Sequence, residues 1–79
     1  METFYAVQLK NLSRGIRDSQ DVYILQILLN SFGYSCGTPD GIYGSRTASG
    51  VLAFRRAVGL PAASTVDMAT WDKIFNYRK

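Results

Sequence analysis

The chain has 79 residues, enough for one small domain and too few for two. Its composition, 47% hydrophobic and 19% charged, is typical of a globular protein and argues against a disordered chain. The net charge of +3 favours anionic partners in general and is too small to indicate nucleic acid. Cys36 is the single cysteine and histidine is absent, so we expect no intrachain disulfide, no metal site and no cofactor.

No stretch of the sequence has the length of a membrane-spanning segment. The longest nearly apolar run, residues 22–29, is interrupted by Gln26 and falls well short of roughly 20 residues. The first ten residues place Glu2 where a secretory signal carries positive charge, and their apolar part is short. We therefore expect no membrane partner and no signal peptide in this chain, so that export would depend on a signal elsewhere or on cell lysis.

The segment from Ser19 to Phe32 is predicted to form the first helix, because its apolar residues recur at steps of three and four. They are Val22, Leu25, Leu28, Leu29 and Phe32. Asp18 or Ser19 can accept hydrogen bonds from the amides of the first turn. Gly33 can adopt the left-handed conformation that ends a helix.

A second helix is predicted to begin at Ser45 and to run to Gly59, where Leu60 folds back and Pro61 blocks continuation. Its inner face carries Val51, Phe54 and Val58. A third helix follows a cap at Asp67 and frays into residues 76–79. We expect its inward residues to be Trp71, Ile74 and Phe75, with Trp71 in the core.

The resulting fold class is all-α, a compact three-helix bundle with a structured loop of glycine, proline and aspartate between the first two helices. In that loop, Thr38-Pro39-Asp40-Gly41 has the residues that a type I turn favours. Residues 1–11 are expected to form a lead-in segment, either packed across one end or arriving from a neighbouring domain, and residues 12–79 the domain itself.

Matching positions of a known family recur in order between Leu12 and Phe75. They are Asp21-Val22, Leu25-Gln26, Leu29, Gly33-Tyr34, Asp40-Gly41-Ile42-Tyr43-Gly44, Thr47, Val51, Phe54, Gly59-Leu60, Val66-Asp67 and Thr70-Trp71. In this order and at this spacing the series resembles the peptidoglycan-binding domain of cell-wall hydrolases and phage lysins. The resemblance implies a three-helix module that carries no chemistry and anchors a hydrolase, or a phage or secreted protein, to murein. The implied location is the cell wall, extracellular or phage-borne.

Four positions depart from the family pattern. Ser19 and Ser64 replace glycine, Gly50 replaces alanine, and Arg55 replaces glutamine. The family places that glutamine near the ligand groove, so a guanidinium at Arg55 is expected to alter which ligand is preferred, or whether one binds at all.

A receptor for peptidoglycan glycan or stem peptide needs aromatic platforms beside fixed donors and acceptors. The predicted ligand-binding residues are Tyr34, Asp40, Tyr43, Thr47 and Arg55. In this hypothesis Tyr43 contacts a sugar or lactyl face and Arg55 pairs with a carboxylate. Structural roles compete with these assignments: Asp40 can bind the amides of its own loop, and both tyrosines can pack against the helices.

Other functions are weighed against peptidoglycan binding. An enzyme is disfavoured because histidine is absent, Glu2 is the single glutamate, and no carboxylate pair is placed for glycoside hydrolysis. The fold could instead serve as a structural or assembly module of a phage tail or secreted machine. A helix-turn-helix nucleic-acid binder is a further alternative, although the linker of residues 60–66 is longer than that motif's turn.

Overall fold

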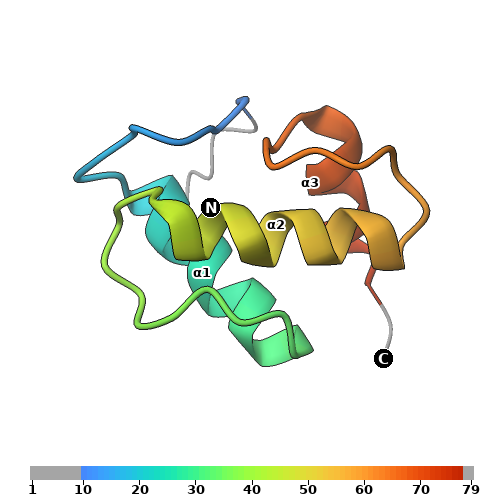
Figure 1. Ribbon diagram of the computed structural model, residues 1–79, viewed down its shortest axis with the longest axis horizontal. Helices are drawn as coiled ribbons and strands as arrows, with labels where there is room; N and C mark the ends of the chain where they lie inside the picture. The colour runs from blue at the N-terminus through green and yellow to red at the C-terminus, as the bar shows by residue number, and fades with distance from the viewer. Residues whose placement is uncertain (1–9, 78–79) are drawn as a thin grey trace, which may run out of the picture.

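The computed structural model describes residues 10–77, which form three α-helices. Helix α1 spans Gln20–Phe32, α2 spans Ser45–Ala57 and α3 spans Met68–Phe75. Figure 1 shows α2 crossing in front of α1, with the loop of residues 33–44 curving back from the end of α1 to the start of α2. Within the described range, extended pairing is limited to one antiparallel bridge, between Leu12 and Val66. The all-α prediction is confirmed.

The predicted start and stop signals of α1 are confirmed. The Ser19 side chain accepts a hydrogen bond of 3.2 Å from the backbone N–H of Val22, which satisfies one of the free amides of the first turn. Gly33 ends the helix with φ at 100°. Its N–H donates to the carbonyl of Asn30, and the next N–H, of Tyr34, donates to that of Leu29.

Helix α2 ends in the same way, with Gly59 at φ 86° and the N–H of Leu60 donating to the carbonyl of Arg55. It begins differently. The preceding residue is Gly44, and no side chain caps the first turn. The predicted start at Ser45 is confirmed, and the glycine that stands before it supplies no capping group.

Helix α3 begins as predicted, with the Asp67 carboxylate accepting from the backbone N–H of Thr70 at 2.9 Å. Trp71 and Ile74 are buried, and the Trp71 indole N–H donates to the carbonyl of Lys10. Phe75, predicted to point inward, is 53% exposed. Consecutive helical residues point about 100° apart, so the ring that follows Ile74 lies outside the core and stacks against the outer side of Trp71.

The core lies between the three helices and the chain that enters them. Its fully buried members include Leu12, Val22, Leu25, Leu29, Val51, Phe54, Val66 and Trp71. Leu12 exchanges both backbone hydrogen bonds with Val66, which fixes the entering chain against the linker between α2 and α3. The Lys10 contact with Trp71 shows that the packed region begins before residue 12, whereas the rest of the predicted lead-in, residues 1–9, lies outside the described residues. In the part of the chain that the structure describes, every helix is too short to cross a membrane.

Candidate functional site at the start of helix α2

The loop between α1 and α2 is held by the side chain of Gln26, which is 1% exposed. Its carbonyl oxygen accepts from the backbone N–H groups of Asp40 and Gly41, at 2.9 and 3.0 Å. Its amide nitrogen lies 3.0 Å from Asp40 Oδ1, 3.0 Å from the Ile42 carbonyl and 2.8 Å from Thr47 Oγ1. An amide has two hydrogens, so these three acceptors share two donors. A single glutamine on α1 thus ties the loop to the first turn of α2.

Asn30, one helical turn after Gln26, fixes the earlier part of the loop. Its amide nitrogen donates to the carbonyl of Gly37 at 2.9 Å, and its oxygen accepts from the N–H of Cys36 at 2.6 Å. Residues four apart in a helix share one face, so both amides project from α1 toward the same loop. The loop therefore has a fixed backbone although it contains no helix or strand.

Asp40 serves the loop itself, as the structural alternative predicted. Its Oδ1 accepts from the N–H of Ile42 at 3.0 Å and from Gln26. These two hydrogen bonds, the first above all, hold the pKa of the Asp40 carboxyl below its usual range. The predicted turn at residues 38–41 is not closed by a backbone bond in the usual way, because the Gly41 N–H donates to the Gln26 side chain instead. Gly41, with φ at 76°, needs to be glycine, since a Cβ would also approach the Ser19 carbonyl oxygen to 3.1 Å.

A pocket of about 360 Å³ opens where this loop meets the start of α2. Its lining residues are Gln26, Cys36, Thr38, Asp40, Ile42, Gly44, Ser45, Arg46 and Thr47. The first three amides of α2, those of Ser45, Arg46 and Thr47, have no acceptor among residues 10–77. Free amides at the start of a helix carry partial positive charge, so the pocket has an electropositive end and a carboxylate, Asp40, on its loop side.

Two predicted site residues, Asp40 and Thr47, line this pocket. Asp40 is exposed and can meet a ligand. Thr47 is 2% exposed, and its hydroxyl accepts from Gln26 and contacts the Ile42 carbonyl at 3.4 Å. Thr47 therefore shapes the floor of the pocket by joining α2 to the loop.

Tyr43 does not present its ring to this pocket. It is 1% exposed, and its hydroxyl donates to the carbonyl of Ser64 in the linker before α3. Burial raises the pKa of the phenol. The predicted contact between Tyr43 and a sugar face is corrected accordingly, because the ring packs in the core and its single polar atom is already bonded.

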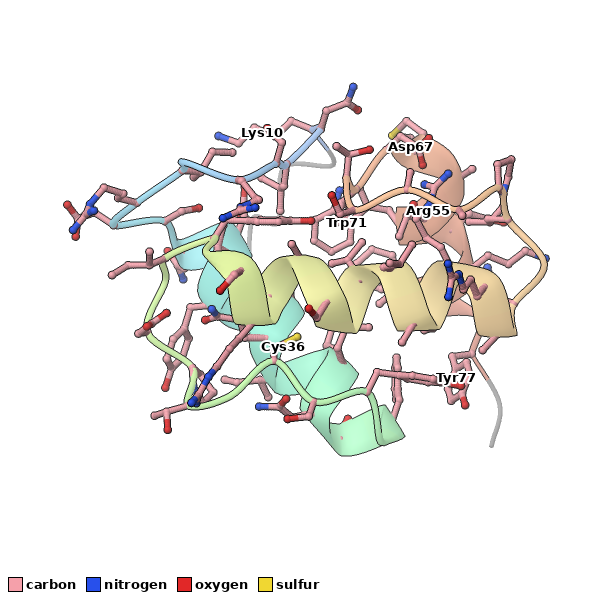
Figure 2. All side chains as sticks on the ribbon, in the orientation of Figure 1. Lys10, Cys36, Arg55, Asp67, Trp71 and Tyr77 are labelled. Carbon is pink, nitrogen blue, oxygen red and sulfur yellow. The ribbon has the colours of Figure 1, made fainter. Side chains whose placement is uncertain are left out.

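Arg55 is likewise buried, with 5% exposure, and faces the linker and α3. Its guanidinium donates to the carbonyls of Pro61 and Thr65, to Asp67 Oδ1 at 3.1 Å and to Thr70 Oγ1 at 2.6 Å. Figure 2 shows Arg55 and Asp67 on the α3 side of α2, and Cys36 on the other side, in the α1–α2 loop. The prediction that Arg55 pairs with a ligand carboxylate is corrected, since the side chain is buried and its Nε and Nη1 groups donate inside the fold.

Tyr34 belongs to a third environment, an aromatic cluster near the end of the chain. Its hydroxyl lies 3.3 Å from that of Tyr77, and its ring meets Phe54 edge-on with centroids 5.5 Å apart. Phe32 stacks on Tyr77 with centroids 4.3 Å apart. Tyr34 is half-buried and does not line the pocket. The structure thus brings together two of the five predicted residues.

Three residues important to this pocket were absent from the prediction: Gln26, Ser45 and Arg46. Gln26 carried a signal in the sequence, because a polar side chain beside the apolar stripe of α1 must find hydrogen-bond partners if it is buried. The sequence carried no such signal for Ser45 and Arg46, since their importance to the pocket follows from the uncapped start of α2.

The unusual Gly50 is explained by the loop that crosses α2. A Cβ at this position would lie 2.6 Å from Cys36 Sγ and 2.9 Å from the Ser35 carbonyl oxygen. Cys36 fills the space that a larger residue at position 50 would take, and it is 2% exposed. Burial raises the pKa of its thiol to about 11, so it is protonated at neutral pH.

Comparison with known proteins fits this architecture. The sequence model of the peptidoglycan binding domain family matches residues 18–74, well over half of the chain. The chain belongs to this family. The match confirms the resemblance seen in the sequence, and the domain has the family's three-helix fold.

Three solved structures illustrate the likeness. The SleB N-terminal domain is 26% identical, with a TM-score of 0.84, over 91% of this chain and 97% of that one. A peptidoglycan-binding protein from Clostridioides difficile, in complex with glutamine hydroxamate, is 33% identical with a TM-score of 0.77 over 84% of this chain. The Burkholderia AP3 phage endolysin is 36% identical with a TM-score of 0.80 over 89% of this chain. The match covers 40% and 26% of the latter two chains, so it describes one part of each.

Proposed function

We propose that this peptidoglycan-binding module holds the stem peptide of murein in the pocket at the start of α2, without converting it chemically. Its role is to keep a tethered partner, a hydrolase or a phage structural domain, at the cell wall. Family membership supports the ligand class. The tethering role is supported by two matched structures in which this fold makes up 40% and 26% of a longer chain.

The stem peptide is favoured over the glycan by the chemistry of the pocket lining. Sugar rings are bound by exposed aromatic faces, whereas peptides are bound by fixed donors and acceptors that meet amides and carboxylates. Among residues 10–77, none that lines the pocket is aromatic, and the ring of Tyr43 is buried in the core. The free amides of the first turn of α2 and the Asp40 carboxylate supply donors and an acceptor instead.

The pocket is poorly equipped for hydrolysis. Glycosidases place two carboxyl groups across the bond they cleave, and one of these must be protonated to act as the acid. Within the part of the chain that the structure describes, Asp40 is the single carboxylate that lines the pocket, and its lowered pKa keeps it ionised at neutral pH. This supports a binding role for the module.

The observation that carries the proposal is the coexistence of an uncapped helix start and an exposed carboxylate in one pocket whose walls are fixed by Gln26. Gly44 allows a direct test. Its φ of −103° and ψ of −160° suit any residue, and a Cβ there meets nothing within 4 Å. The glycine is therefore not required by the backbone.

In Gly44→Asp, the new carboxylate caps α2 and occupies the free amides that we assign to the ligand. The variant should be as stable as the parent, or more stable by a few tenths of a kcal/mol, while its co-sedimentation with insoluble peptidoglycan falls severalfold. Gly44→Ala, which leaves the amides free, is the matched control and should sediment like the parent. Equal sedimentation of Gly44→Asp and the parent would contradict the proposed site.

A further inference from the structure

A second hollow, of about 300 Å³, adjoins the pocket. Its lining residues are Ser35, Gly37, Ser45, Arg46 and Ser49. Ser45 and Arg46 line both cavities. The side chain of Arg46 thus lies along the boundary between them, where a ligand that enters either one meets it.

The side chain of Arg46 packs against the loop at Gly37. A Cβ on Gly37 would come within 2.8 Å of Arg46 Cδ and 3.2 Å of its Nη1, so the arginine side chain lies directly against the backbone of residue 37. Gly37 has φ at 77°, and its carbonyl is fixed to α1 by Asn30. The absence of a side chain at residue 37 is what lets Arg46 lie there.

The guanidinium of Arg46 is left available by the fold. Arg46 is exposed, and among residues 10–77 it has no hydrogen-bond acceptor or ion-pair partner. Arg55, nine residues later on the same helix, contrasts with it: that guanidinium is buried and donates to four acceptors. Of these two arginines on α2, Arg46 is the one whose donors are open to a ligand.

We infer that Arg46 selects stem peptides by charge, by pairing with a free carboxylate and disfavouring the corresponding carboxamide. This inference rests on the proposed function and specifies which ligand the pocket prefers. A carboxylate accepts two parallel N–H bonds from a guanidinium, whereas a carboxamide presents one acceptor together with an N–H₂ group that opposes the arginine donors. Arg46 therefore disfavours the carboxamide in two ways, because it loses one hydrogen bond and faces an N–H₂ group that opposes its own donors.

The test uses two synthetic stem peptides that differ in one group, a free carboxylate or its carboxamide. Each is titrated into the full chain and followed by NMR shifts of the backbone amides. We expect the free acid to bind on the order of tenfold more tightly. In Arg46→Gln the two affinities should become equal, through loss of affinity for the acid. Arg56→Gln removes an exposed arginine of the same helix that lines neither cavity, and it should behave like the parent.

Two results would overturn the inference: equal affinity of the parent for both peptides, or a preference that survives in Arg46→Gln. In either case the proposed function stands if the peptides still bind. Failure of both peptides and of intact peptidoglycan to bind the parent would overturn the proposed function as well. A second variant, Gly37→Ala, keeps the arginine but displaces its side chain, so it should also reduce the preference for the free acid. An unchanged preference in this variant would contradict the position assigned to the Arg46 side chain.

Discussion

Replacing Gln26 by methionine removes the hydrogen bonds that hold the loop while keeping the length and approximate volume of the side chain. Gln26 donates two hydrogens and accepts two, so four hydrogen bonds are lost. Each contributes about 0.5–1.5 kcal/mol net, which gives about 2–6 kcal/mol in total. Asp40 is exposed, so its carboxylate and backbone N–H can form hydrogen bonds with water once Gln26 is replaced. We therefore expect a loss in the lower half of this range, about 2–4 kcal/mol. A chain of this length is stable by on the order of 4–12 kcal/mol.

The loss is measured by urea unfolding followed through the fluorescence of Trp71, the single tryptophan, which is buried in the core. Hydrogen exchange of the Asp40 and Gly41 amides gives a local readout, because both should lose protection. Gln20→Met, at an exposed position of the same helix, is the control and should change stability by less than about 0.5 kcal/mol. A loss below about 1 kcal/mol in Gln26→Met, with both amides still protected, would refute the role given to Gln26.

Three further predictions concern buried or ionised groups. Arg55→Met should lower the free energy of unfolding by about 2–3 kcal/mol in urea, because acceptors in α3 and the linker are left without their donor. Arg56→Met, at an exposed position, should change it by less than about 0.5 kcal/mol, and equal losses in the two variants would contradict the buried network. Hydrogen bonds from Thr70, with a smaller contribution from Arg55, lower the pKa of Asp67, so its stabilising contribution is complete above pH ~4 and is lost as the pH falls further. Asp67→Asn should therefore flatten the decline of stability between about pH 4 and pH 2, and an unchanged slope would count against this coupling. The Cys36 thiol, with a pKa of about 11, should react with iodoacetamide at pH 8 at least about tenfold more slowly in native buffer than in urea; equal rates would contradict its burial.

Features that depend on neighbours in the chain were predictable. Ser19, Gly33 and Asp67 cap or end helices through bonds to residues three to five positions away, and the structure confirms each. Phe75 was placed wrongly, because periodicity defines a face only approximately in a helix of eight residues. The start of α2 at Ser45 was predicted correctly, whereas the lack of a capping side chain at Gly44 was not noted in advance.

The site was less predictable because side-chain direction depends on partners far along the chain. The Tyr43 hydroxyl bonds Ser64, 21 residues later, and the Arg55 guanidinium bonds Thr70, 15 residues later. Nothing in the spacing of the sequence shows that these polar groups are already occupied inside the fold. Asp40 lines the pocket because its position follows from the loop that contains it, and its role in ligand binding stays a prediction.

The most direct test of the central claim is co-sedimentation of the parent chain with two insoluble preparations: intact peptidoglycan, and the same glycan after amidase removal of its stem peptides. We predict that the chain sediments with the intact material and stays in solution with the stripped glycan. Equal sedimentation with both would place recognition on the sugar backbone and contradict the stem-peptide site. Absence of sedimentation with either would contradict wall binding and favour a structural or assembly module.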